Sequence, residues 1–441
     1  MASPDFHIVI VGAGLGGLAA AIGIAKAGHR VTILEQAPEL GEIGAGIQIP
    51  PNASRILKRW GLLPEIERAS VCPKDFILRS YRNGKILSVQ NVFPFTREQY
   101  GAPYLHIHRA DYHAILLKEA LRLKVAVHLD STVIGIDFET PVVHLKDRPD
   151  FPADVVIGAD GLKSACREAL LGHPDPPKLT GDLAYRIIVR AEDMKKHAEL
   201  REFVENPSIN FWMGPNAHAV CYFLQGGSLY NIVLICPDNL PELVNIAKAD
   251  LQEMRSFFEH WDPRLKILLD LVQETSKWRL QNSVEMATWS HPSGKFALLG
   301  DACHATLPYL AQGAAQAVED GAVLGTLFEK IEDRSQLVDI LEIYEALRKA
   351  RTTSIVRGST ALRDIFHMQD GPEQRNRDRS LLYEVPYEGY PNRWADPIFQ
   401  PFLFGYDAFA EATKSWEEYV NGEFPRKNKR LHAHFMLSPK D

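Results

Sequence analysis

The chain has 441 residues, of which 46% are hydrophobic and 24% charged, a composition ordinary for a globular protein with two or more interlocked domains. Its 49 Lys and Arg against 56 Asp and Glu give a net charge of −7, which provides no electrostatic reason to expect nucleic acid or an anionic membrane as partner. The five cysteines are scattered without CxxC or metal-like Cys/His spacing, so we expect reduced thiols, no metal site and a cytoplasmic location. No stretch reaches the ~18 uninterrupted apolar residues of a membrane span.

The first predicted element is a strand over residues 7–11, a β-branched run (HIVIV) long enough to be buried on both faces. An Ala-rich helix follows and ends near Gly28, a residue type common at helix C-caps. The segment RVTILE (30–35) is typical of a second strand. Together these elements have the size of a right-handed βαβ unit in a parallel sheet.

The turn between the first strand and the helix carries a glycine pattern. Gly12, Gly14 and Gly17 form G-x-G-x-x-G, in which the first glycine permits a tight turn, the second lets the backbone approach a pyrophosphate, and the third lets helix and strand pack closely. Glu35 ends the second strand, where an acid accepts hydrogen bonds from a ribose diol. The pattern predicts a bound dinucleotide and serves NAD and FAD equally.

The middle of the chain predicts a second type of sheet. Residues 74–104 contain alternating apolar and polar segments around an Asn-Gly turn, which indicates a hairpin. The segment ADVVIGADG (153–161) is typical of another buried parallel strand. From about 181 to 289, longer strands are mixed with helices such as 248–260, and we interpret this region as an antiparallel sheet forming a second domain.

Three further segments indicate where a ligand lies. Arg109 precedes a helix, where a buried Arg could pair with phosphate or hold a ring system, and Asp160 ends a buried strand; the alternatives are a surface Arg near a helix start and a helix N-cap. In GDACHATLPYLAQGAAQAVED (300–320), Asp301 ends a strand and the next helix opens on small residues, so something other than protein is expected to fill the space there. Past 315 the pattern is helical to about 368, and the last seventy or so residues show weak periodicity, as in an irregular cap or a partly disordered tail.

These motifs together resemble the three flavin motifs of the group A flavoprotein monooxygenases, the single-component aromatic hydroxylases. Within that family the chain is most similar to fungal salicylate hydroxylase-like members, on GAGIQIPPNASRIL (44–57) and WADPIFQPFLFGYDA (394–408). The resemblance covers essentially the whole chain. It implies FAD as cofactor and NAD(P)H as co-substrate without a Rossmann domain of its own, and it is only loosely specific for substrate.

The resemblance implies an α/β fold with a Rossmann-like FAD-binding domain of the p-hydroxybenzoate hydroxylase-like (GR2) type. An antiparallel-sheet substrate domain is interleaved with it, and a helical segment follows at the C-terminus. The expected segments are FAD-binding at 1–73, 105–180 and 290–360, a substrate-domain hairpin at 74–104, the main substrate domain at 181–289, and a C-terminal cap at 361–441.

The expected FAD-binding residues come from the three motifs and their neighbours: Gly12, Gly14, Leu15, Gly17, Glu35, Gln36, Gly46, Arg109, Asp160, Asp301, Gly313, Ala314 and Ala315. In the family, the Asp that matches Asp301 binds the ribityl chain, and the element around Asp160 touches both FAD and the nicotinamide. The helix beginning near Gly313 would aim its N-terminus at the flavin pyrimidine, where it stabilises the negative charge of reduced flavin. His304 is expected to order its loop or to face outward rather than act as a base, and Cys303 to be a small buried residue.

The family chemistry implies that NAD(P)H reduces FAD, O2 then forms a flavin C4a-hydroperoxide, and the distal oxygen attacks an electron-rich aromatic carbon. Because phenols react as phenolates, a cation or hydrogen-bond donor is expected beside the substrate. Arg186 is the first candidate, followed by Tyr222 and His218, whose alternation along one strand points both to the same face. Each is equally compatible with an ordinary sheet position. Tyr185 has the parity opposite to Arg186 and is expected to pack, while Gln48 is a weaker candidate near the flavin edge.

Several alternatives stay open at this point. A salicylate-type acid hydroxylated at the carboxyl-bearing carbon would release CO2 and leave a catechol, whereas a larger polyketide phenol could be hydroxylated or dearomatised. A flavin oxidase or reductase that inserts no oxygen is a second class, and a flavin-bound regulatory or scaffold protein is a third. The sequence distinguishes neither NADH from NADPH nor a monomer from a homodimer.

Overall fold

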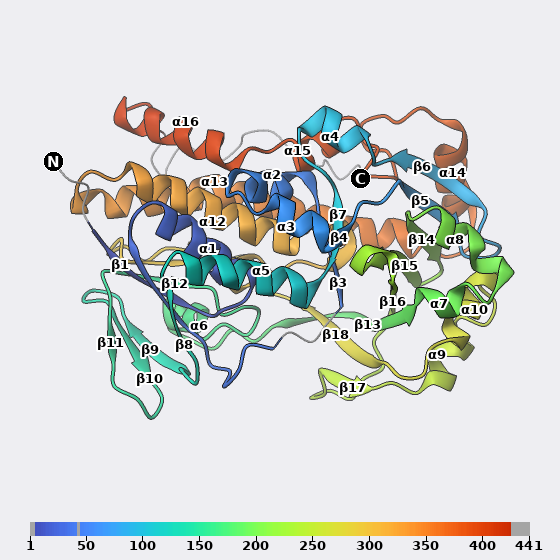
Figure 1. Cartoon of the computed structure of the whole chain (residues 1–441), viewed down its shortest axis with the longest axis horizontal. Helices are drawn as coiled ribbons and strands as arrows, with labels where there is room; N and C mark the ends of the chain where they lie inside the picture. Colours follow the sequence, from blue (N-terminus) through green and yellow to red (C-terminus); the bar gives the residue numbers. More distant parts are fainter. Residues whose placement is uncertain (1–4, 42–44, 425–441) are drawn as a thin grey trace.

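The computed structural model describes residues 5–41 and 45–424. Figure 1 shows two halves, a parallel sheet with its helices at one end and a large, mostly antiparallel sheet at the other. Two long helices, α12 (Gly313–Lys330) and α13 (Leu337–Phe366), lie beside each other and connect the halves. This is the mixed α/β architecture expected from the sequence.

The parallel sheet has five strands in the order β19-β12-β1-β2-β8. All neighbouring strands in it are parallel, as expected for a βαβ-built domain. Its strands are β1 (His7–Val11), β2 (Arg30–Leu34), β8 (Ala126–His128), β12 (Val155–Gly158) and β19 (Phe296–Leu298). The strands predicted at 7–11, 30–35 and 153–161 are therefore confirmed, with β12 shorter than its segment.

Helix α1 (Leu15–Lys26) packs against α12 through glycine. A Cβ on Gly23 would lie 2.4 Å from the carbonyl oxygen of Gly321, and a Cβ on Gly321 would lie 2.6 Å from the backbone of Ala19. Larger residues at either position would push the two helices apart. This close contact aligns the two helices whose N-termini lie near the cavity described below.

The second sheet has eight strands in the order β17-β18-β13-β16-β15-β14-β5-β6. Its members are β5 (Asp75–Ser80), β6 (Ile86–Asn91), β13 (Lys178–Arg190), β14 (Ile209–Gly214), β15 (Ala217–Leu224), β16 (Leu229–Pro237), β17 (Ile246–Lys248) and β18 (Ser276–Asn282). The predicted hairpin is confirmed as the antiparallel pair β5–β6. The sheet is not wholly antiparallel, because β5 pairs with β14 in parallel. The chain between these two strands crosses through the other half, and such a long connection allows parallel pairing.

One helix of this region was predicted too long. Where a helix over 248–260 was expected, strand β17 ends at Lys248 and helix α9 covers only Leu251–Phe257. Asp250 explains the late start, because its Oδ1 accepts a hydrogen bond from the backbone N–H of Gln252 at 2.8 Å and caps the helix.

Two small sheets complete the β-structure. The order β3-β7-β4 joins β3 (Gly46–Ile49), β7 (Leu105–His108) and β4 (Ser70–Val71), and β7 and β4 contact β15 of the large sheet. The order β11-β10-β9 joins β11 (Phe151–Pro152), β10 (Val142–Leu145) and β9 (Val133–Asp137), away from the large sheet in Figure 1.

Short helices surround these sheets. They are α2 (Pro51–Arg59), α3 (Leu63–Arg68), α4 (Phe95–Tyr100), α5 (Arg109–Arg122), α6 (Ala165–Leu171), α7 (Ala191–Met194), α8 (Arg201–Glu205), α10 (Pro263–Asp270) and α11 (Asp301–His304). Short 3-10 turns are η1 (Ala198–Leu200), η2 (Gln225–Gly227), η3 (Pro308–Leu310) and η4 (Arg334–Gln336).

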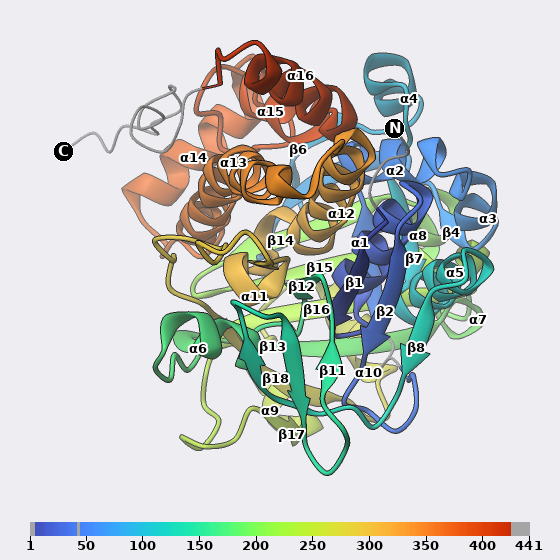
Figure 2. The same ribbon diagram turned by 90° about the vertical axis from the view of Figure 1, so that its left-hand side faces the viewer.

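The C-terminal segment is more regular than its sequence suggests. It forms α14 (Pro372–Tyr383), α15 (Phe399–Phe404) and α16 (Ala408–Val420), and α16 lies over α12 and α13 in both Figures 1 and 2. Helix α14 buries only Arg377 and Leu381, which explains its weak apolar periodicity. The last part of the predicted cap, 425–441, lies outside the described residues.

Within the described ranges, no helix has the length and apolar character needed to cross a bilayer.

Candidate active site

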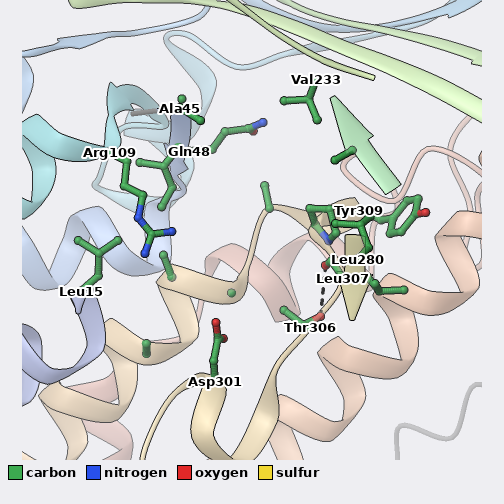
Figure 3. A pocket seen from close by; sticks show the side chains of 18 of the residues that line it. Leu15, Ala45, Gln48, Arg109, Val233, Leu280, Asp301, Thr306, Leu307 and Tyr309 are labelled. Carbon is green, nitrogen blue, oxygen red and sulfur yellow. Dashed lines mark hydrogen bonds between the residues drawn. The ribbon is translucent and has the colours of Figure 1, made fainter. Parts of the chain in front are cut away.

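One cavity lies where the N-termini of α1 and α12 approach the eight-stranded sheet. Its volume, about 330 Å³, is within the usual range of small-molecule sites. Figure 3 shows Asp301 and Leu15 on the side of the helices, with Gln48 and Val233 opposite. Most of the predicted site residues line this cavity: Gly14, Leu15, Gly46, Arg109, Arg186, His218, Tyr222, Asp301, Gly313 and Ala314.

The glycine turn before α1 combines tight packing with one open position. Gly12 has a φ of +103°, and a Cβ on it would lie 2.5 Å from the carbonyl oxygen of Ala159. A Cβ on Gly17 would lie 2.0 Å from the carbonyl oxygen of Gly12. Gly14, by contrast, has nothing within 4 Å of a Cβ and caps α1 without a side-chain hydrogen bond. The start of α1 therefore has both the open space and the N–H groups that an anionic group requires.

The opposite helix, α12, begins in the same way. Its first turn has no acidic residue, and no side chain caps it. Gly313 and Ala314 line the cavity, so the helix presents backbone there rather than bulky side chains. The positive end of its dipole consequently faces the cavity.

Asp301 lies at the start of α11 and directs its side chain into the cavity (Figure 3). Among the described residues, none donates a hydrogen bond to its carboxylate. The neighbouring loop is fixed from behind, because Asp320 Oδ2 accepts from the backbone N–H of Gly300 at 3.0 Å and lies 2.6 Å from His304 Nε2. His304 is buried and orders the loop, as expected from the sequence, and burial raises the pKa of the Cys303 thiol well above its usual value.

The far wall of the cavity consists of neighbouring strands of the large sheet, held in register. One row across the sheet is Ala184, Ile235 and His218, and the next is Arg186, Val233, Val220 and Phe211. Tyr222 lies in the row beyond, opposite Asn231. All of these except Asn231 line the cavity, so β13, β15 and β16 present one face to it. Tyr185 has the opposite parity and is buried in the core on the other face, as expected.

Arg186 brings a guanidinium into this mostly apolar wall. Its carbon Cζ lies 5.4 Å from the centre of the Trp278 ring, and no carboxylate of the described residues pairs with it. The Arg186 side chain is exposed to the open cavity rather than packed in the core. Desolvation by the surrounding cavity walls, together with the nearby charge of Arg109, lowers the pKa of Arg186, although arginine stays protonated at neutral pH. An anion in the cavity would relieve this uncompensated charge.

His218 and Tyr222 are both enclosed by protein. Burial lowers the pKa of His218 well below its usual value, and neighbouring His367 adds to the effect, so His218 is neutral at neutral pH. Burial also raises the pKa of Tyr222, which stays a neutral phenol. Gln48 accepts a hydrogen bond from Tyr104 at 2.5 Å and lines the cavity beside them.

The remaining predicted residues lie behind the cavity surface. Gln36 is exposed, while Gly12, Gly17 and Ala315 pack within the turn or helix rather than lining the cavity. Glu35 accepts hydrogen bonds from the backbone N–H of Ala13 at 2.8 Å and Ala37 at 2.9 Å, so it braces the glycine turn. Their roles toward the cofactor stay predictions.

Asp160 also lies behind the surface. Its carboxylate accepts from Ser164 Oγ at 2.5 Å and from the backbone N–H of Cys166 at 3.0 Å, at the start of α6. The N-cap residue of α6 is Ser164, whose Oγ accepts from the backbone N–H of Arg167 at 2.8 Å, so Asp160 supports this cap without being the N-cap itself. Its neighbours Ala159 and Gly161 line the cavity instead. A role toward flavin or nicotinamide stays a prediction.

Two polar residues at or behind the cavity wall are absent from the sequence-based predictions. Tyr309 lines it and donates a hydrogen bond to buried Asp182 at 2.7 Å, and His367 lies 2.8 Å from His218. Tyr309 falls inside the Asp301 motif, which could have identified it. His367 has no local signal, because it meets His218 only through the packing of α13 against the sheet.

Comparison with known proteins places the chain among flavin enzymes. The FAD binding domain family matches residues 5–359. The chain belongs to this family. It is 45% identical to an FAD-dependent monooxygenase, OpS4, of Beauveria bassiana over 92% of this chain and 96% of that protein. It is also 33% identical to a 3-hydroxybenzoate 6-hydroxylase of Polaromonas naphthalenivorans over 83% and 89% of the two chains.

Solved structures agree on the fold. A salicylate hydroxylase in complex with substrate superposes with a TM-score of 0.77 at 24% identity, covering 93% of this chain and 97% of that one. CtdE, in complex with FAD and a substrate, gives a TM-score of 0.80 at 22% identity over 95% and 99%. The protein is an FAD-dependent aromatic monooxygenase of the hydroxylase fold, and reduced nicotinamide and O2 are its co-substrates, as is typical of the family.

The residues around the cavity fit FAD. Gly14 leaves room at the start of α1, Asp301 offers a carboxylate with no partner among the described residues, and Gly313 leaves room at the start of α12. Diphosphate, ribityl hydroxyls and an electron-accepting ring are groups that two helix N-termini and a carboxylate can hold.

Proposed function

We propose that the enzyme hydroxylates a phenolic compound that carries a carboxylate group. The observation that supports this is Arg186, a guanidinium that lines the cavity with no carboxylate partner among the described residues. Arginine binds carboxylates through paired, charge-assisted hydrogen bonds, and such bonds strengthen where water is excluded. The apolar side chains around Arg186, including Val220 and Val233, would accommodate an aromatic ring.

His218 supplies the base in this proposal. A phenol must lose its proton to become electron-rich, and His218 is a neutral imidazole on the cavity wall. Its Nε2 has no hydrogen-bond partner among the described residues, so this atom is available to accept the proton. Bound FAD would pass the reducing equivalents of NAD(P)H to O2 and so supply activated oxygen at the cavity. Tyr222 and Gln48 would orient the ring from the adjacent row, and the apolar walls would exclude water.

The position of hydroxylation decides the product. Attack at the carboxyl-bearing carbon of a salicylate-type acid releases CO2 and leaves a catechol, while attack elsewhere retains the carboxylate. The similarity to a 3-hydroxybenzoate 6-hydroxylase and to a salicylate hydroxylase fold supports testing both acids.

A variant of Arg186 tests the proposal. FAD-loaded enzyme would be given salicylate or 3-hydroxybenzoate with NADH or NADPH in air, and product and consumed cofactor would be quantified together. Arg186→Ala should raise KM for the accepted acid about 10- to 100-fold through loss of a charge-assisted interaction, while retaining FAD. Arg190→Ala is the matched control, because Arg190 lies on the same strand with 64% of its side chain exposed.

The outcomes separate the alternatives. Native KM and rate in Arg186→Ala would contradict the assignment of Arg186 to a substrate carboxylate. Catechol and CO2 formed in step with consumed cofactor would establish decarboxylating hydroxylation. Oxygen from 18O2 absent from every product would instead favour a flavin oxidase or reductase.

A second candidate substrate is a larger phenol without a carboxylate. The rows of apolar residues favour it, since Phe211, Ile235 and Leu280 extend the wall beyond Arg186. In that case a carboxylate-free phenol would be turned over, and Arg186→Ala would affect its KM little.

A further inference from the structure

Behind the cavity wall, a second histidine contacts His218. Nδ1 of His218 lies 2.8 Å from Nε2 of His367, and their ring centres are 5.1 Å apart. His218, on β15, is 1% exposed, whereas His367 is half-buried at the C-terminal end of α13. The pair therefore extends from the cavity toward the outside of the protein.

The surrounding elements hold this geometry. The backbone N–H of Asn216, in the turn before β15, donates to the carbonyl of His367 at 3.1 Å. The charged and titratable groups facing His367 are Asp182 on β13 and Arg363 on α13, which pair at 2.5 Å, together with Tyr309 on η3. Tyr309 donates to Asp182 and packs 5.1 Å from the His218 ring. The Asp182 carboxylate is therefore occupied by Arg363 and Tyr309. The ring nitrogen in contact with His218 Nδ1 belongs to His367.

We propose that His367 acts through His218 to carry the phenolic proton of the substrate from the cavity to solvent. This inference rests on the proposed function, because it assigns a path to the proton that His218 accepts. Neither ring nitrogen at the ends of the path, Nε2 of His218 and Nδ1 of His367, has a hydrogen-bond partner among the described residues. Each end is consequently available, one to the substrate and the other to water.

The transfer balances with one proton entering and one leaving. The substrate O–H bond breaks as its proton binds His218 Nε2, while the Nδ1 proton of His218 passes to His367 Nε2. His367 Nδ1 then releases its proton to water. Both rings end neutral in the other tautomer, and the phenolate is left in the cavity. The reverse sequence, driven by proton uptake from solvent, restores the starting tautomers when a proton returns to the product.

The pKa values of both imidazoles agree with rings that pass a proton on rather than remain protonated. Burial lowers the pKa of His218 well below its usual value. Burial and the charge of Arg363 lower the pKa of His367 to about 4, against the opposing effect of Asp182. At neutral pH neither imidazole retains an added proton, so a proton accepted on one side leaves on the other.

The test compares His367→Gln with wild-type, FAD-loaded enzyme. Glutamine keeps an acceptor for the Nδ1 proton of His218 but cannot pass a proton on. We expect unchanged FAD retention, but at least a 10-fold slower proton release, measured with a pH indicator in stopped flow after mixing with salicylate or 3-hydroxybenzoate. Imidazole added to His367→Ala should restore the rate. His173→Gln, at an exposed histidine near α6, is the matched control.

Native proton release in His367→Gln would overturn the relay, as would loss of activity in His367→Ala that imidazole fails to restore. A measurement on the wild type alone guards against misfolded variants. The three protons that move together in the relay predict a curved dependence of the rate on deuterium fraction, and a linear dependence would overturn the inference. If the wild type hydroxylates no phenol, the proposed function itself fails, an outcome distinct from normal proton release by an active variant.

Discussion

Two groups of charged residues lie on either side of the first half of α12. The two groups differ in whether their charges are paired with opposite charges of the protein. Behind the helix, Arg348 and Arg351 pair with Glu319 and Asp320 at 2.5–2.7 Å, and all four are buried. Burial opposes ionisation of Asp320, yet His304 and Arg348 hold its pKa at about 2. In front of the helix, Asp301 and Arg186 line the cavity, and neither is compensated in this way by another described residue.

Asp301 and Arg186 represent this second group. Neither pairs with an opposite charge among the described residues, although both line the same cavity. A charge in the protein interior must be paired because desolvation is costly, whereas a charge at an open cavity can be paired by a ligand. The comparison separates charges that maintain the fold from charges available for binding.

The largest effect is expected from breaking the buried group. Arg348→Ala would leave Glu319 and Asp320 with insufficient positive charge in the interior and should destabilise the protein by about 3–5 kcal/mol. The midpoint of urea unfolding of the FAD-free protein measures this. Arg357→Ala is the control on the same helix, because Arg357 forms a surface pair with Glu285 and is 74% exposed, so a loss of at most ~1 kcal/mol is expected. Equal losses in the two variants would contradict the comparison.

Asp301→Ala should have an intermediate effect and only on binding. The family resemblance implies that this carboxylate accepts hydrogen bonds from the ribityl hydroxyls of FAD, and on that expectation its removal should raise the Kd for FAD about 10- to 100-fold. The stability of the FAD-free protein should change little, since the carboxylate has no partner among the described residues. Fluorescence titration with FAD measures the Kd. A large loss of stability without FAD would place Asp301 with the charges that maintain the fold.

The smallest effect concerns acid stability. The pKa of His106 is lowered by burial to about 3, and that of His367 is lowered to about 4. The unfolded chain, with ordinary histidines near 6.5, therefore binds more protons than the folded protein below that pH, so stability is full above pH ~6.5 and falls toward pH 4. His367→Gln should reduce the loss at pH 5 by about 1–2 kcal/mol relative to wild type, measured by urea unfolding at pH 7 and 5. An unchanged pH dependence would contradict neutral burial of His367.

Local patterns predicted the parts of the molecule that local interactions build. The run at 7–11 is β-branched and forms β1, the glycine pattern forms the turn before α1, and the hairpin follows from alternation around an Asn-Gly turn. Departures arose where one side chain outweighed periodicity, as when Asp250 delayed the start of α9. The parallel pairing of β5 with β14 depends on a connection through the other half, which no local pattern contains.

The sequence by itself determined the cofactor class, because the motifs around Gly12, Asp160 and Asp301 each consist of neighbouring residues that together resemble the flavin motifs of a known family. It also determined which residues of β13 and β15 share a face, since side chains alternate along a strand. Only the tertiary structure decided that Arg186 has no carboxylate partner among the described residues and that His367 meets His218. Those relations join residues far apart in the chain, and long-range packing sets them without leaving a periodic or spaced signal in the sequence.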